Sequence, residues 1–177
     1  MLLIVPTQHH TQQDLWSSEV LIDAARLALE MGDKHGGDEG YRAISNFGLQ
    51  AHQSQPHAHI HIVSGTSRQL QSAVQKSSLD RTKLTSVVEY DVDESPFAAS
   101  IAPSTAMSQR ELWGSGQILE TSRQAIAVAE RYSPNGFRLM SSFDPSTTNN
   151  PGQQRRAGGE NPASLFLLGG GQLGLYV

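Results

Sequence analysis

The sequence predicts an α+β fold made of two homologous halves, each with an antiparallel sheet and one main helix. Two observations support this class. Each half contains short apolar runs separated by turn residues, together with one longer segment of helical periodicity. Motifs of residues 1–75 also recur in the same order in residues 90–177, which leaves residues 76–89 as a linker. We therefore expect the halves to pair as an intrachain pseudo-dimer.

The repeat consists of matching segments that lie 96 or 97 positions apart. They include Trp16 and Trp113, the only two tryptophans of the 177 residues. The matched segments are Ile4-Val5-Pro6-Thr7 with Ile101-Ala102-Pro103-Ser104, Asp14-Leu15-Trp16 with Glu111-Leu112-Trp113, and Gly40-Tyr41-Arg42 with Gly136-Phe137-Arg138. Further along, Pro56 aligns with Pro162 when ten residues are inserted in the second half. Chance would not keep so many matches in one order.

Each half is expected to run strand, helix, strand, strand. In the first half, residues 2–5 form an apolar run that ends at a proline, as a strand should. Residues 17–31 carry apolar side chains at helical spacing, and the glycines that follow are expected to end that helix. Residues 41–45 and 57–63 are the two remaining strands.

The second half repeats this pattern with a helix over residues 118–132 and strands over 137–141 and 164–168. Before it, residues 87–93 alternate as a strand does. Residues 65–85 are predicted as polar linker, and residues 144–161, rich in proline, glycine and asparagine, as a long loop.

Composition excludes several function classes. The net charge of −4 argues against a basic nucleic-acid groove. The chain has no cysteine, so disulfides and thiolate catalysis are excluded, and a cytoplasmic location is expected. No apolar run approaches the roughly 20 residues that span a bilayer, and the first residues lack the basic region of a signal peptide. We expect neither nucleic acid nor a membrane as partner.

Four of the seven histidines fall between residues 52 and 61. On an extended strand, His57, His59 and His61 would line one face while the apolar residues between them are buried on the other. Neighbouring imidazoles suit phosphorus chemistry, because one can attack as a neutral nucleophile while another donates hydrogen bonds to phosphoryl oxygens.

This row, with its flanks, resembles the motif of the histidine triad (HIT) family, in which three histidines alternate with apolar residues. The segment Gln53-Ser54-Gln55-Pro56-His57-Ala58-His59-Ile60-His61-Ile62-Val63 carries the motif, and Asn46-Phe47-Gly48 resembles the turn that precedes it. Ile4-Val5-Pro6-Thr7-Gln8-His9 resembles the strand and turn before the family's helix. The resemblance covers residues 2–65.

The resemblance implies nucleotide hydrolysis through a nucleotidyl-histidine intermediate, on nucleoside phosphoramidates or related conjugates of a nucleotide, expected to be a purine nucleotide. It implies that His59 attacks the α-phosphorus, that His61 binds phosphoryl oxygens and that His57 orients the nucleophile. His9 would be an accessory histidine. The phosphate or leaving group would be contacted by Asn46, Gln53 and Ser54.

Other activities stay open. A dinucleoside polyphosphate hydrolase and a nucleotidyltransferase fit the same motif, although the transferase branch carries glutamine where this chain has His61. A module that binds nucleotide without catalysis is the alternative of another class. In the second half the alignment sets Ala163, Leu165 and Leu167 against the three histidines, so we expect one active site per chain and a monomer with pseudo-two-fold symmetry.

The nucleoside pocket is the point where the sequence departs from the family. HIT domains begin with two strands that contact the base and ribose, and this sequence starts at the equivalent of the third. Either residues 90–97 of the second half, from Tyr90 to Phe97, supply those contacts, or the nucleoside is bound weakly.

Zinc is the main alternative for the histidine row. In an extended strand the Cα atoms of His57 and His61 would lie about 13 Å apart, so three rings could not share one ion without strain. No Asp or Glu lies between Glu39 and Asp80. We therefore expect no metal and no cofactor.

Overall fold

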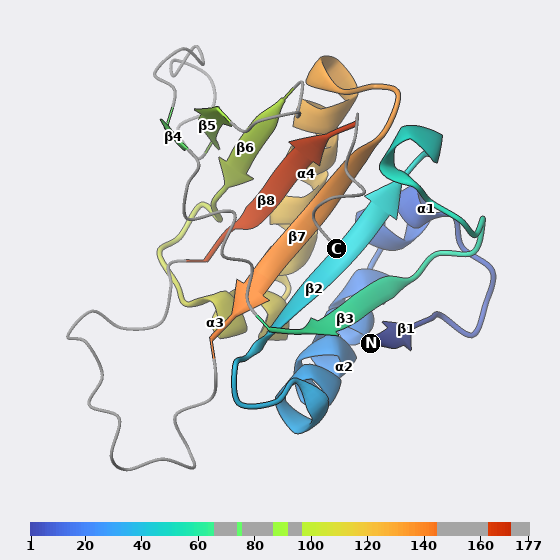
Figure 1. The fold of residues 1–177 in the computed structure, drawn as a ribbon, viewed down its shortest axis with the longest axis vertical. Coiled ribbons are helices and arrows are strands. Elements are labelled where there is room, and N and C mark those ends of the chain that lie inside the picture. The colour runs from blue at the N-terminus through green and yellow to red at the C-terminus, as the bar shows by residue number, and fades with distance from the viewer. Residues whose placement is uncertain (66–73, 76–86, 92–96, 145–162, 171–177) are drawn as a thin grey trace.

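A single eight-stranded sheet forms the centre of the molecule. The structure is a computed structural model that describes residues 1–65, 74–75, 87–91, 97–144 and 163–170. The strand order is β1-β3-β2-β7-β8-β6-β5-β4, and every neighbouring pair is antiparallel (Figure 1). The strands are β1 (Leu2–Ile4), β2 (Tyr41–Phe47), β3 (Ile60–Ser64), β4 (Val74–Gln75), β5 (Val87–Asp91), β6 (Ala98–Ile101), β7 (Phe137–Phe143) and β8 (Leu165–Gly169). The predicted α+β class with an antiparallel sheet is confirmed.

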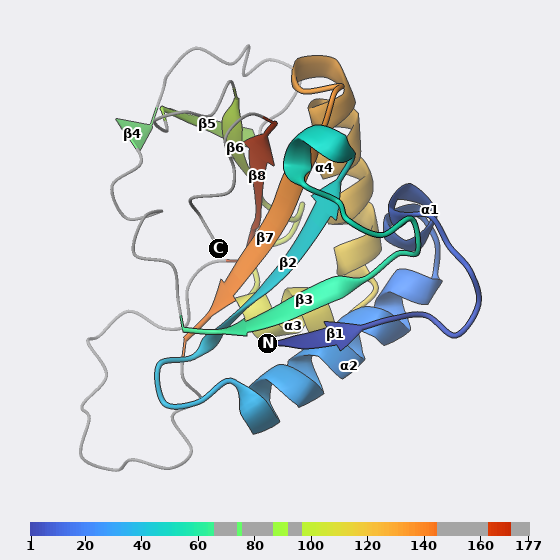
Figure 2. The ribbon, with the colours of Figure 1, turned by 45° about the vertical axis from the view of Figure 1, so that its right-hand side comes forward.

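The α-helices cover one face of this sheet, as Figures 1 and 2 show. They are α1 (Gln12–Ser17), α2 (Val20–His35), α3 (Gln109–Gly114) and α4 (Gln117–Tyr132). A 3-10 turn, η1 (Leu49–Ala51), follows β2. We call the opposite face of the sheet the far face. Within the described residues, no helix has the length and apolar character needed to traverse a bilayer.

The short helices α1 and α3 were not predicted, although both have a clear signal. Each begins with a capping box, in which Thr11 pairs with Asp14 and Ser108 pairs with Glu111. In such a box the first side chain accepts from a backbone N–H of the first turn, and the acidic side chain accepts from the capping residue. Six residues give too short a periodic pattern, so only the cap marks these helices.

The two longest strands, β2 and β7, pair at the centre of the sheet. Ile44 lies opposite Met140, and the pairing runs without a break from Tyr41 opposite Phe143 to Phe47 opposite Phe137. The aromatic rings of these two end pairs stack at 4.7 and 4.3 Å between centroids. Since Ile44 and Met140 are 96 positions apart, residues matched in the sequence lie symmetrically about this pair.

The core between sheet and helices contains both tryptophans. The rings of Trp16 and Trp113 meet edge to face, with centroids 6.0 Å apart, and both are buried. Each indole N–H donates to a serine on a central strand, Trp16 to Ser45 at 3.1 Å and Trp113 to Ser141 at 3.0 Å. The indoles are therefore packing residues whose polar atoms are satisfied within the core.

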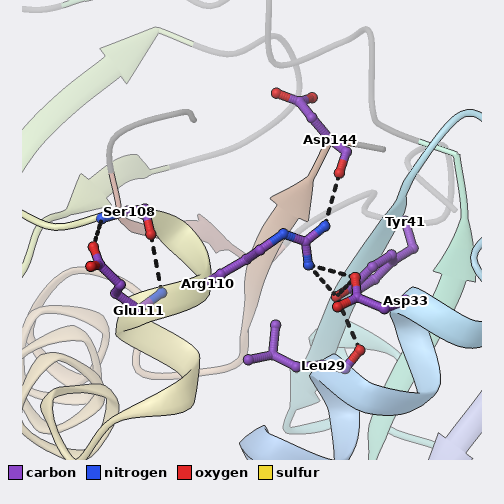
Figure 3. Close-up of polar contacts among 7 residues, drawn as sticks. All are labelled: Leu29, Asp33, Tyr41, Ser108, Arg110, Glu111 and Asp144. Carbon is purple, nitrogen blue, oxygen red and sulfur yellow. Dashed lines mark hydrogen bonds and ion pairs between the residues drawn. The ribbon is translucent and has the colours of Figure 1, made fainter. Parts of the chain in front are cut away.

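A polar contact joins the helices of the two halves on the outside of this core (Figure 3). The Arg110 guanidinium on α3 forms an ion pair with Asp33 on α2 and donates to the backbone carbonyl of Asp144 at 3.1 Å. The Tyr41 hydroxyl donates to the same Asp33 carboxylate at 3.2 Å. The contact therefore links α2, α3 and the region just after β7.

Part of the predicted organisation lies outside the described residues. This holds for residues 76–86 of the predicted linker and for residues 145–161 of the predicted loop. Residues 87–89, the last three of the linker, belong to β5, which pairs with β6.

Candidate active site

The histidine motif lies on and just before β3, between β1 and β2. His61 is opposite Leu3 of β1 on one side and Ile44 of β2 on the other. Ile60 and Ile62 are buried in the core under the helices. Because side chains alternate along a strand, His61 belongs to the far face of the sheet.

The backbone of His59 is held on both sides by one glutamine. Gln12 accepts from the His59 N–H at 2.9 Å and donates to the His59 carbonyl at 2.8 Å. Ser45 donates to the same carbonyl at 3.0 Å. Hydrogen bonds from α1 and β2 thus fix the His59 backbone, independently of its side chain. Only 6% of the residue is exposed. Such support limits the freedom of the ring, which favours catalysis.

The ring of His59 is oriented by a backbone oxygen. Its Nδ1 lies 2.9 Å from the carbonyl oxygen of His57. A carbonyl can only accept, so Nδ1 carries the proton, and in the neutral ring Nε2 holds the lone pair. The tautomer needed for nucleophilic attack through Nε2 is therefore the one that this contact favours.

His61 lies beside His59 and stays neutral. The two ring centroids are 4.7 Å apart, in an edge-to-face arrangement. Burial, helped by the electrostatic influence of His59 and Arg138, lowers the pKa of His61 to about 4. At neutral pH this ring therefore has one N–H that can donate a hydrogen bond and carries no charge.

The ring of His57 does not point along with the other two. The Nε2 of His57 lies 3.1 Å from the carbonyl oxygen of Pro6, and its ring centroid lies 5.2 Å from that of His9. The four imidazoles thus form two pairs rather than one row. The prediction of an extended strand over residues 57–63 is wrong at its start, because β3 begins at Ile60, where pairing with β1 begins. His57 contacts the nucleophile candidate through its carbonyl group, not its ring.

Asn46 lies on β2 opposite Arg138 of β7. Its side-chain oxygen accepts from the Arg138 Nε at 2.7 Å. This leaves the amide nitrogen of Asn46 as the hydrogen-bond donor that the residue can offer to a ligand. This partner of Asn46 was not predicted, although the place of Arg138 in the repeated Gly-aromatic-Arg segment was recognised.

Residues 1–68 match the family model described as the HIT domain. Residues 1–68, called the HIT domain below, are thus the part of the chain that is similar to HIT domains. This confirms the resemblance inferred from the motif. The chain is 37% identical over 67 residues to an uncharacterized HIT-like protein of Chlamydia muridarum (strain MoPn / Nigg). It is 36% identical over 67 residues to one of Chlamydia trachomatis serovar D (strain ATCC VR-885 / DSM 19411 / UW-3/Cx).

These matches cover 36% of this chain in both cases, and 53% and 60% of the two relatives. The chain therefore spans a little over half the length of the curated relatives that it matches. No solved structure matches the chain.

Gln53, which was predicted to contact the phosphate, makes its hydrogen bonds within the loop that precedes the histidine motif of the HIT domain. The Gln53 amide accepts from the backbone N–H of Gly48 and donates to the carbonyl of Gln55, both at 2.9 Å. Ser54 is exposed. Gln53 thus shapes the loop between η1 and the histidines, while Ser54 presents its side chain to solvent.

Outside the HIT domain match, the second half repeats the support of His59 around Ser164. Gln109 accepts from the Ser164 N–H at 2.7 Å and donates to its carbonyl at 2.9 Å. Ser141 donates to that carbonyl at 3.0 Å. The structural counterpart of His59 is therefore Ser164, and that of His61 is Phe166.

The sequence alignment that set Leu165 and Leu167 against these histidines is wrong by one residue. Leu165 and Leu167 are buried under the helices, where Ile60 and Ile62 lie in the HIT domain. Alignment on the prolines missed this, because in the sequence Pro56 precedes His59 by three residues and Pro162 precedes Ser164 by two. The second half still offers no imidazole at these two positions.

Tyr90 and Phe97 do not reach the histidines of the HIT domain. Four strands separate β5 from β3, and Tyr90 packs against Phe166 with centroids 5.6 Å apart. Phe97 stacks on Tyr132. Tyr90 and Phe97 therefore do not supply the suggested base contacts at this site, and residues 92–96 between them lie outside the described residues. Apolar residues next to His61 include Leu3 and Ile44 on the neighbouring strands and Val63 on β3.

No group of three or more His, Asp or Glu side chains that could hold a metal ion is found among the residues that the structure describes. The two imidazole pairs of the HIT domain are arranged for hydrogen bonding with backbone carbonyls, as described above for His57 and His59.

Proposed function

We propose that the chain is a nucleotide hydrolase of the histidine triad type, which cleaves nucleoside phosphoramidates or related conjugates of a nucleotide. The observation that carries this proposal is the contact between His59 Nδ1 and the His57 carbonyl, with the neutral His61 ring next to it. Together they give a nucleophile with a free lone pair and an uncharged donor beside it.

In the first step, the lone pair of His59 Nε2 forms a bond to the α-phosphorus while the bond from phosphorus to the leaving amine breaks. The amine departs with a proton. The pair formed by His9 and His57, whose ring centroids lie 5.2 Å apart, is the candidate source of that proton, because an imidazolium can act as a general acid. His61 donates a hydrogen bond to a phosphoryl oxygen during this step.

In the second step, water attacks the nucleotidyl-histidine. A bond forms from the water oxygen to phosphorus, the bond from phosphorus to His59 Nε2 breaks, and the proton of the water passes to an imidazole of the pair that gave one up. The products are the nucleoside monophosphate and the His59 ring in its starting tautomer. Asn46 and Ser54 are the polar neighbours proposed to contact the phosphate or leaving group, while Gln53 shapes the loop.

We also propose that the second half takes the place of a second subunit. The symmetric pairing of β2 with β7 and the duplicated support of His59 and Ser164 favour this view. The chain would then be a monomer, and small-angle scattering in dilute solution should give a mass near 19.2 kDa. A stable species of twice that mass would count against the intrachain pseudo-dimer.

The activity is tested by incubating the protein with an adenosine phosphoramidate and following AMP release. Wild-type turnover that disappears in His59→Ala supports the proposal. Undetectable turnover together with AMP binding in the micromolar range would instead support the non-catalytic binding module. Parallel assays with a dinucleoside polyphosphate, and with a second acceptor in place of water, measure the other two activities of this motif.

A further inference from the structure

Arg138 is a buried arginine on the far face of the sheet. Only 2% of the residue is exposed, and it lies on β7, outside the HIT domain match. Its Nε donates to Asn46 on β2, so the side chain reaches from the second half across the central strand pair. Asn46 is one of the residues that the HIT resemblance assigns to the phosphates.

The guanidinium is only partly satisfied. Its Nη1 is buried and has no hydrogen-bond partner. Burial and the like charge of Arg42 both lower the pKa of Arg138, and within the described residues no carboxylate acts on it in the opposite sense. A buried cation without an anion is unfavourable, because it loses hydration and gains no counter-charge. The free N–H therefore points to an anion that is bound during function.

The register places this group next to the imidazoles. Ile44 on β2 is opposite both His61 on β3 and Met140 on β7. Two residues further along β2, Asn46 is opposite Arg138. The pairing of β2 with β3 stops at Ile44 and His61, but the next residue, Ser45, donates to the His59 carbonyl, so His59 lies beside this part of β2. The charge of Arg138 is also close enough to influence His61.

We infer that Arg138 is a substrate-binding residue of the histidine site, and that its Nη1 donates a hydrogen bond to an oxygen of the substrate's phosphoryl group. This inference rests on the proposed function. Asn46 fixes the guanidinium through Nε, and the phosphoryl group supplies the missing counter-charge. The second half then completes the site as well as the sheet.

The test measures the affinity of the folded protein for AMP and for inorganic phosphate by calorimetry. Arg138→Gln removes the charge but keeps a long polar side chain, and Arg138→Lys keeps the charge. Arg42→Gln is the matched control, because Arg42 holds the position of Arg138 in the first half and lies opposite Ser142 instead of Asn46. Thermal unfolding of each variant reports any purely structural role.

We expect Arg138→Gln to weaken binding of both probes about tenfold or more, as loss of a hydrogen bond to a charged group does. Arg138→Lys should recover part of the affinity, and Arg42→Gln should change it less than Arg138→Gln. Wild-type affinity in Arg138→Gln, with or without a change in unfolding temperature, would overturn the inference and leave the proposed function intact.

Failure of the proposed function has a different signature. If wild type binds AMP and phosphate but releases no AMP from a phosphoramidate, the hydrolase proposal fails while the affinities still decide the role of Arg138. If wild type binds neither probe, both are overturned.

Discussion

Matching hydrogen bonds hold the backbones of His59 and Ser164, but the side chains of these two residues differ. In both halves a glutamine of the short helix brackets the backbone, and a serine of a central strand donates to the same carbonyl. In the first half this support holds an imidazole; in the second it holds a hydroxyl. These backbone hydrogen bonds are thus a property of the fold, and the chemistry depends on which side chain they position.

The halves also differ in how their central arginines are held. Arg138 donates to Asn46, whereas Arg42 donates to the backbone carbonyl of Gly65. The counterpart of Asn46 is Ser142, whose buried hydroxyl lacks a hydrogen-bond partner. The asymmetry places the second half's arginine beside the first half's imidazoles, so the half without the histidine pair still contributes to the site that we propose.

The largest effect is expected from the pair His59→Ala and Ser164→Ala. If His59 is the nucleophile, its removal should lower kcat by about a thousandfold or more, since no other group takes its place. Ser164→Ala removes the equivalent side chain and should leave kcat within about twofold. Equal losses in the two variants, measured by AMP release, would break the comparison.

Ser45→Ala and Ser141→Ala test the scaffold. Each deletion removes the acceptor of a buried indole N–H and a donor to the bracketed carbonyl. Both should therefore lower the free energy of unfolding by about 1–3 kcal/mol in denaturant titrations. Only Ser45→Ala should also lower kcat, because only this variant removes a hydrogen bond that holds the His59 backbone. A tenfold loss of kcat in Ser141→Ala would contradict this.

His61 should make the free energy of unfolding depend on pH, which its counterpart Phe166 cannot do. The pKa of His61 is about 4 in the folded chain against its ordinary value of 6.5, so between these values the unfolded chain binds a proton that the folded chain does not. Stability should therefore rise with pH across this window, and His61→Gln should flatten that rise. His35→Gln, which removes an exposed histidine, is the control. An unchanged slope in His61→Gln would refute the neutral, half-buried ring.

The smallest effect is expected at the contact between the halves on the helix side. The side chains of Arg110 and Asp33 are 24% and 41% exposed, so water screens their attraction. Arg110→Gln should cost less than about 1 kcal/mol of unfolding free energy and leave activity unchanged. Loss of the cooperative unfolding transition in this variant would mean that the halves depend on that contact far more than their shared core indicates.

The elements that could be predicted from the sequence are those whose apolar residues recur at helical or strand spacing. The long helices and the central strands follow from apolar spacing, which reflects which face is buried. The alternation of His59, Ile60, His61 and Ile62 likewise predicted which of them face the core. Alternation says nothing about where pairing with β1 begins, so the start of β3 and the direction of the His57 ring were wrong.

The missed contacts of the candidate site are long-range and polar. Gln12 and Arg138 reach His59 and Asn46 across 47 and 92 residues, and no local pattern marks such partners. Repetition was the available signal, because Gln12 and Gln109 recur at the same spacing as the tryptophans. That repeat marks the two glutamines but not their partners, because His59 lies 47 residues after Gln12 and Ser164 lies 55 residues after Gln109.

Trapping the covalent intermediate tests the central claim most directly. A phosphoramidate labelled in its nucleotidyl group is mixed with the protein, the reaction is stopped within the first turnover at alkaline pH, and the peptides are mapped by mass spectrometry. The account predicts an acid-labile nucleotidyl group on His59, absent from His59→Ala and unchanged in Ser164→Ala. Label on another residue, or steady AMP release with no labelled peptide at any time point, would contradict it.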